Sequence, residues 1–242
     1  MKILAVASMA LELKPWLRRC QSLKKLGWPL SFAQTAQWNR AILFAVANGP
    51  GPRLAAKALQ IAIEKAGPFD ALMSVGLCGA LDKDLKLNDI YCATEVSDGD
   101  TSWPVVTMSG GIAAPLLSLD RFLGNPEEKR KWTEKGFGIV EMEAAAIAKY
   151  ASENDIPFTA VKVVSDLAAE RFALDFNQYR DEAGRFSNTR IALAALAHPI
   201  LYAPDLYRMA SRGPAASEIL GKFLANSRFK FPHHARRGLP RP

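Results

Sequence analysis

The chain has 242 residues, 49% of them hydrophobic, and carries a formal net charge of +7. This length can bury one core without disulfides. Three cysteines and three histidines make no zinc-binding pattern, so we expect no metal and no cofactor. Such cysteine usage fits a reducing, cytoplasmic setting. No run reaches the roughly 18–20 apolar residues of a membrane-spanning helix. The apolar start is short and is soon interrupted by Glu12 and Lys14, which favours a buried strand over a signal peptide.

The net charge is concentrated near the C-terminus. From Leu206 onward the sequence holds eight Lys or Arg and one acid, whereas residues 1–205 hold 23 of each sign. Such a segment suits an anionic membrane surface or nucleic acid, and a solvated end is the simpler alternative. There is no nucleic-acid module and no run of interleaved aromatic residues, so we expect no nucleic-acid partner. Peripheral membrane contact remains the functional interpretation of this tail.

Short apolar runs alternate with helical patterns along the first part of the chain. The runs have the length of strands covered on both faces, and read "KILAVA", "AILFAVAN", "FDALMSVG", "DIYCATEV", "GIVEM" and "FTAVKVVSD". Between them, residues 53–66 carry an apolar stripe that ends at Gly67, and residues 143–155 form a second, alanine-rich helix. This alternation predicts an α/β fold, with a sheet sandwiched by helices.

The pattern changes after about residue 187, where only helical segments occur. We expect these segments to be broken at Pro199, Pro204 and Pro214. The sequence therefore predicts three parts: an α/β domain over residues 1–187, a helical extension over 188–226 and a basic, disordered tail over 227–242.

Two glycine loops come directly after predicted strands. "NGPGPR" (residues 48–53) precedes a helix and could hold an anion through Gly51 and Arg53, and "SVGLCGAL" (74–81) contains Gly76. Neither loop has the spacing of a P-loop or a dinucleotide fingerprint, so tight strand-to-helix turns explain them equally well.

Carboxylates stand at the ends of two later strands. Glu141 and Glu143 lie between the apolar residues "FGIV" and "AAAIA", where a carboxylate is costly unless it is paired or bound. Ordinary first-turn acids are the alternative. Ser165 and Asp166 end another strand, where α/β sheets bind ligands, although Ser-Asp is also a common helix cap.

Taken in order, these motifs resemble the purine nucleoside and uridine phosphorylase superfamily, nearest the methylthioadenosine/S-adenosylhomocysteine nucleosidases. The resemblance covers residues 1 to about 180. Its motifs are "MKILAVASMALELKP", "NGPGPRLAAKAL", "SVGLCGALDKDLKLNDI", "SLDRFL", "VEMEAAAIA" and "VVSDLA". It implies a three-layer α/β/α sandwich with a mixed, partly barrel-like sheet, a nucleoside substrate and a homodimer or larger homo-oligomer.

The resemblance also implies roles for single residues. Asp166 would protonate the departing base, Glu143 would bind the ribose hydroxyls, and Glu12 would activate water. Ser165 would hold Asp166, and Phe122 and Phe176 would sandwich the base. The remaining substrate-binding residues implied are Met9, Gly76, Leu77, Leu123, Val140, Glu141 and Met142.

The nucleophile and the 5′-substituent stay open at this point. Superfamily phosphorylases carry an Arg and a Ser where this chain has Ser74 and Leu77, which favours water, whereas Arg53 keeps phosphate possible. The helical extension, preceded by "EAGRF", resembles the hopanoid-associated phosphorylases, thought to remove adenine from a lipid nucleoside. The favoured interpretation is a nucleosidase that cleaves a 5′-substituted adenosine with water and releases adenine. Removal of adenine from a lipid nucleoside, a purine nucleoside phosphorylase reaction and an inactive nucleoside-binding homologue are the alternatives.

Overall fold

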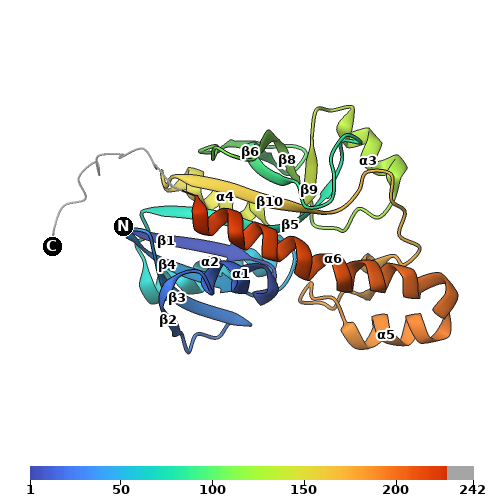
Figure 1. Cartoon of the computed structure of the whole chain (residues 1–242), viewed down its shortest axis with the longest axis horizontal. Coiled ribbons are helices and arrows are strands. Elements are labelled where there is room, and N and C mark those ends of the chain that lie inside the picture. Colours follow the sequence, from blue (N-terminus) through green and yellow to red (C-terminus); the bar gives the residue numbers. More distant parts are fainter. Residues whose placement is uncertain (228–242) are drawn as a thin grey trace.

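A mixed β-sheet forms the centre of the molecule (Figure 1). The computed structural model describes residues 1–227, and within them ten strands join one sheet. The strands are β1 (Lys2–Ala7), β2 (Gln21–Lys25), β3 (Phe32–Trp38), β4 (Ala41–Ala47), β5 (Ala71–Ala80), β6 (Ile90–Ser97), β7 (Ser102–Pro104), β8 (Ile112–Ser118), β9 (Ile139–Glu141) and β10 (Phe158–Asp166). The helices are α1 (Ala10–Leu17), α2 (Pro52–Ala66), α3 (Pro126–Thr133), α4 (Ala144–Glu153), η1 (Phe176–Tyr179), α5 (Asn188–Ala197) and α6 (Pro199–Asn226).

Part of the sheet closes on itself. The strand order is β10-β6-β8-β9-β5-β1-β4-β3-β2, with β7 beside β6, and β10 pairs with β5 as well as with β6. The ring β10-β6-β8-β9-β5 is therefore a closed five-stranded barrel, from which β1 to β4 continue as an open sheet. Parallel and antiparallel pairs both occur, for example β1 with β5 and β5 with β9. The predicted mixed, partly barrel-like sheet is confirmed.

Helices cover both faces of the open sheet. Leu4 and Val6 of β1 pack in one apolar cluster with residues of α2 and α4. Ile3 and Ala5 of the same strand pack in a second cluster with residues of α1 and α6. Successive side chains of a strand point to opposite faces, so a strand buried on both faces must be apolar throughout. This explains the continuous apolar runs in the sequence and gives the three layers.

Helix α6 corrects part of one prediction. The break expected at Pro199 occurs, because α5 ends at Ala197 and α6 begins at Pro199, but Pro204 and Pro214 do not break α6. It is continuous from Pro199 to Asn226, with Pro199 in the first turn and Pro204 and Pro214 inside. An internal proline costs about 3 kcal/mol, so packing must compensate. The second half of α6 supplies that packing: its buried residues join the core beside α1, and a Cβ on Gly221 would meet the Trp16 backbone nitrogen at 2.6 Å.

The first half of α6 and the antiparallel α5 project from one end of the body (Figure 1). Their inner face packs on η1 around Leu174, Phe176 and Ile191. Asp205 of α6 is buried, accepts the Leu174 amide and pairs with Arg208. Apart from residue 227, the predicted basic tail (residues 227–242) lies outside the described residues. Among residues 1–227, no helix is both long and apolar enough to span a membrane.

Candidate active site

The predicted site residues come from the ends of β1, β4, β8, β9 and β10 and from the interior of β5, with Phe176 on η1. The register pairs Lys162 of β10 with Gly76 of β5, and Asp166 with Gly79. β9 then pairs with β5 through Val140. β9 runs antiparallel to β5, so its last residue, Glu141, lies beside the stretch of β5 just before Gly79, next to the end of β10. The structure thus brings the carboxylates of residues 12, 141, 143 and 166 to one region.

Glu12 is buried and fully engaged. One carboxylate oxygen accepts the Ser8 hydroxyl and the Met9 amide, both at 2.8 Å, and the other accepts the Leu77 amide at 2.9 Å. The two bonds from residues 8 and 9 cap the start of α1. Gly76 makes this possible: its φ is +150°, and a Cβ there would lie 2.5 Å from a Glu12 oxygen. Glu12 therefore links the first strand to the second glycine loop.

Glu141 forms a buried ion pair with Lys162. The Lys162 ammonium lies 2.6 Å from the carboxylate and also donates to the Ser74 hydroxyl at 2.9 Å. Glu141 accepts the amides of residues 143 and 144 as well, at the start of α4. Burial alone would raise the pKa of Glu141, but the Lys162 charge and these hydrogen bonds outweigh it and lower the pKa. Glu141 is therefore a fixed anion whose charge is largely balanced.

Glu143 is also buried, but no described cation pairs with it directly. Its carboxylate accepts the Gly51 amide at 2.9 Å, which ties α4 to the first glycine loop. Burial, and next the charge of Glu141, raise the pKa of Glu143 to about 8. Glu143 is thus poised to take up or release a proton near neutral pH. Glu12 raises this pKa and Lys162 lowers it, so the four groups form one electrostatic cluster.

Asp166 ends β10 beside a lysine from another element. The Lys129 ammonium of α3 lies 2.5 Å from Asp166 Oδ2. Ser165 Oγ donates to the Cys78 carbonyl at 3.1 Å and approaches Asp166 Oδ1 at 3.4 Å. Burial raises the pKa of Asp166 even though Lys129 opposes it. Gly79 permits this approach, because a Cβ there would lie 2.8 Å from the carboxylate.

A small cavity connects Asp166 with the segment of the two glutamates. Its volume is about 30 Å³, and it is lined by Gly79, Arg121, Phe122, Leu123, Val140, Glu141, Met142 and Asp166. That volume holds one or two waters, so a purine requires the surrounding side chains to move. The predicted Phe122 and Phe176 are neighbours, but their rings meet edge to face with centroids 5.3 Å apart. A base can stack between them only after one ring shifts.

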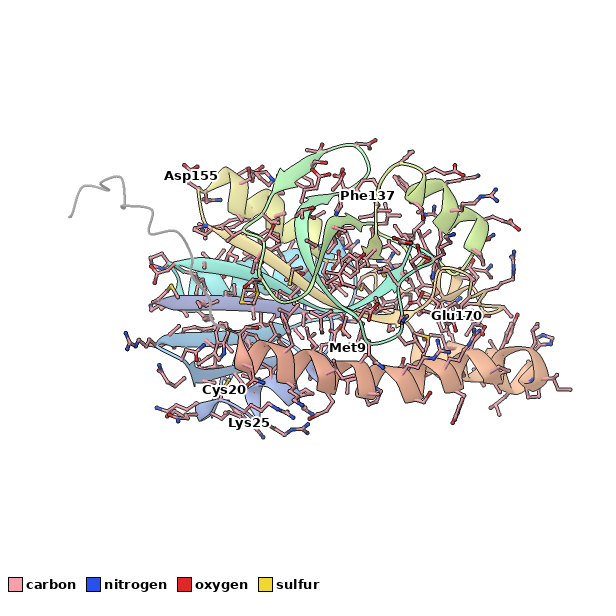
Figure 2. The ribbon with its side chains drawn as sticks, turned by 45° about the horizontal axis from the view of Figure 1, so that its top comes forward. Met9, Cys20, Lys25, Phe137, Asp155 and Glu170 are labelled. Atoms are coloured by element: carbon pink, nitrogen blue, oxygen red, sulfur yellow. The ribbon has the colours of Figure 1, made fainter. Side chains whose placement is uncertain are left out.

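The remaining predicted residues border this site. Met9 is half-exposed at the start of α1. Leu77 contacts helix α6, since a Cβ on Gly213 would lie 3.7 Å from it. Figure 2 shows Met9 and Glu170 beside α6, and Glu170 is tied to that helix by Arg212 at 2.8 Å. Helix α6 therefore covers the side of the site that Leu77 and the loop after β10 form.

The backbone amide and the arginine of the first glycine loop that could bind a ligand form hydrogen bonds within the protein instead. The Gly51 amide is taken by Glu143, and the Arg53 guanidinium donates to the Glu182 carbonyl at 2.8 Å. The structure does not bring Arg53 together with Gly51 as an anion site. Instead Arg180 approaches Gly51, but its guanidinium is bound by Asp120 at 2.7 Å. Within residues 1–227, no group of His, Cys, Asp and Glu side chains could hold a metal ion.

Two lysines of this site, Lys162 and Lys129, were not predicted from the sequence. Lys162 had a signal, because it interrupts the apolar run "FTAVKVVSD" at a position that must be buried. Lys129 had none, since it stands in "PEEKRKW", which has the composition of a solvated helix. Only the tertiary contact of α3 with the end of β10 distinguishes Lys129 from its neighbours.

Comparisons with known proteins agree with this architecture. The structure superposes with a TM-score of 0.69 on the 5′-methylthioadenosine/S-adenosylhomocysteine nucleosidase of Neisseria meningitidis, which was solved in complex with methylthio-immucillin-A. That enzyme is 17% identical, over 93% of this chain and 96% of that one. The corresponding Colwellia psychrerythraea enzyme, in complex with adenine, has a TM-score of 0.61 and 20% identity, over 69% of this chain and 83% of that one. These structures confirm the nucleoside phosphorylase fold.

Sequence comparison gives the same result. The 5′-methylthioadenosine/S-adenosylhomocysteine nucleosidase of Staphylococcus epidermidis is 27% identical over 178 residues, covering 60% of this chain and 78% of the relative. The Staphylococcus aureus enzyme is 27% identical over 177 residues, with 60% and 77% covered. The family model of the phosphorylase superfamily matches residues 32–118 and 104–197, which together exceed half of the chain. The chain therefore belongs to the phosphorylase superfamily.

Proposed function

We propose that the protein hydrolyses the N-ribosidic bond of a 5′-substituted adenosine and releases adenine. The observation that carries this proposal is the buried Asp166 carboxyl beside a cavity that also borders the acidic segment around Met142. Cleavage of such a bond gives the sugar cationic character and the departing base negative charge. Asp166 and Glu141 both line this cavity, and Glu141 belongs to one electrostatic cluster with Glu12 and Glu143. An acid and a group of carboxylates are therefore close enough to match this separation of charge.

The proton for the base comes from Asp166. A carboxyl group can donate near neutral pH only if its protonated form is stabilised, and burial raises the pKa of Asp166 in this direction. The Ser165 hydroxyl keeps the carboxyl oriented. With Leu123 and Phe122 bordering the same cavity, the base would lie between Asp166 and the backbone of the loop after β8.

The ribose is held by Glu143. Once Glu143 has released its proton, its hydrogen bonds from a sugar diol are charge-assisted, and they strengthen as the sugar becomes cationic. Three glutamates, at positions 12, 141 and 143, face one lysine, Lys162, in this cluster. Once Glu143 has released its proton, the excess of negative charge in this cluster favours a cationic transition state over the neutral nucleoside. Met142, on the cavity wall, packs against the sugar in this arrangement.

Water, activated by Glu12, is the nucleophile that the geometry favours over phosphate. A phosphate dianion needs free amides and arginines. Here the Gly51 amide is occupied by Glu143, Arg53 is bound at the Glu182 carbonyl, and Ser74 accepts from Lys162. The relatives named nucleosidases, and their complexes with adenine and an inhibitor, support the same choice.

The direct test is an assay of free base. The protein is incubated with 5′-methylthioadenosine, S-adenosylhomocysteine, adenosine or inosine, each with and without phosphate. We expect adenine release from the 5′-substituted adenosines at a rate that phosphate does not change. Release that requires phosphate would replace hydrolysis by phosphorolysis. A protein that binds these nucleosides but releases no base would be the inactive homologue.

One observation favours a lipid nucleoside as the second candidate substrate. The α5–α6 hairpin exposes large apolar side chains, namely Leu193, Leu196, Ile200, Leu201 and Tyr207. Residues 183–204 contain two arginines and one histidine but no acidic residue, so this tip suits an anionic membrane surface. Flotation with anionic liposomes tests it: the Leu196→Ser/Ile200→Ser variant should lose binding that the parent shows, and the parent's failure to float would remove this candidate.

The remaining partner proposal is a homodimer, which the resemblance implied. Light scattering across a concentration series measures it directly. A mass of twice 26.5 kDa is expected, and a constant monomer mass would contradict it.

A further inference from the structure

Lys129 is the most deeply buried cation of the described structure that the proposed reaction does not use. Its side chain is 1% exposed, whereas its neighbours Arg130 and Lys131 on α3 are exposed. Its ammonium contacts Asp166 Oδ2 at 2.5 Å and donates to the Leu167 carbonyl at 2.9 Å. Helix α3 therefore carries exposed charged side chains next to one buried lysine, which contacts the carboxyl group that would protonate the base.

The surroundings leave Asp166 as the carboxyl partner of this ammonium. Glu170, on the loop after β10, is bound by Arg212 of α6 and by the Leu167 amide. The Cys78 thiol of β5 is buried, and burial raises its pKa. A buried ammonium is costly unless it is paired, so the contact with Asp166 is what allows Lys129 to be buried here.

We propose that Lys129 is a positioning residue that acts through Asp166, supplying the proton that Asp166 passes to the departing base. This inference rests on the proposed function. The Lys129 ammonium gives a proton to Asp166 as Asp166 protonates a nitrogen of the base. The electron pair of the C–N bond stays on the base. Water adds its oxygen to the sugar carbon and gives a proton to Glu12. Lys129 then regains its proton, and Glu12 loses one, through solvent.

Three variants separate this role from a structural one, with kcat and kcat/KM for adenine release measured from pH 5 to 10. Lys129→Met leaves Asp166 as a lone buried acid. It should stay active at acidic pH, with its alkaline loss of activity moved down by about 1–3 pH units. Lys129→Arg keeps the charge but cannot give up a proton. Its kcat should fall at least about tenfold at every pH, with KM little changed. Lys131→Met is the matched control and should behave as wild type.

Several results would overturn the inference. A fully active Lys129→Arg enzyme would make Lys129 a structural or purely electrostatic partner. A Lys129→Met enzyme that is faster at neutral pH would mean that Lys129 holds Asp166 in its ionised form. Thermal unfolding shows whether either Lys129 variant fails to fold. In that case the pH profile of the other Lys129 variant decides whether the inference stands.

The proposed function can fail separately. If wild type releases no adenine, or Asp166→Asn is fully active, the proposed function falls and takes this inference with it. If Asp166→Asn is inactive while both Lys129 variants match wild type, only the role of Lys129 is refuted.

Discussion

Replacing Glu143 with glutamine should stabilise the protein while removing its activity. The folded protein raises the pKa of Glu143 to about 8, from an ordinary value of 4.5. Between these two pH values the native state keeps a proton that the unfolded chain has lost. Stability therefore falls as pH rises through this window. Glutamine does not titrate, and its side-chain oxygen can still accept the Gly51 amide, so the variant escapes this loss.

The size of the effect depends on the shift in pKa. Each pH unit in the window costs wild type up to about 1.4 kcal/mol, so the limit above pH 8 is about 5 kcal/mol. Relaxation of the site and water penetration reduce this limit. We expect Glu143→Gln to be more stable than wild type by about 2–4 kcal/mol at pH 8.5 and by a near-zero amount at pH 4.5.

Urea unfolding of both proteins at several pH values measures this difference. Glu153→Gln, which removes an exposed carboxylate of α4, is the matched control and should give a flat, near-zero difference. If Glu143→Gln differs from wild type by the same amount at every pH, or is less stable at pH 8.5, then Glu143 is not a strained buried acid. Retained adenine release by this variant would separately contradict its role in binding ribose.

Three further predictions concern packing around the site. Lys162→Met leaves the Glu141 charge buried without its partner, and should cost about 3–5 kcal/mol of unfolding free energy in urea titrations at pH 7; an unchanged midpoint would refute that pairing. Gly221→Ala places a methyl group against the α1 backbone and should lower stability by about 1–3 kcal/mol, which a thermal melt equal to wild type would contradict. Gly76→Ala pushes against Glu12 at a left-handed backbone position, so kcat for adenine release should fall at least about tenfold; full activity would show that the Glu12 position is not critical.

The sequence predicts the sheet well because burial on both faces leaves a clear mark. The apolar runs that became β1, β5 and β10 cannot be read as half-exposed strands, and the α2 stripe ends at Gly67 as expected. Helix α6 was mispredicted because local rules count its internal prolines as breaks, whereas its stability comes from contacts with α1 that are distant in sequence.

The candidate site is only partly readable from the sequence. Acidic residues in an apolar setting indicate Glu141 and Glu143, since such residues need a partner or a ligand. The partners themselves are harder to predict. Lys162 lies opposite Gly76 through strand register, and Lys129 reaches Asp166 through the placement of α3. Neither contact is encoded in local spacing. The edge-to-face contact of Phe122 with Phe176 depends likewise on side-chain packing.

The central claim is that Asp166 gives a proton to a purine as its ribose becomes cationic. The most direct measurement is the single-turnover rate of adenine release from 5′-methylthioadenosine by wild type and by Asp166→Asn, at pH 7 without phosphate. Removing a general acid should slow release by about 10²–10⁴-fold, with the substrate still bound. Release by Asp166→Asn at the wild-type rate would contradict the account.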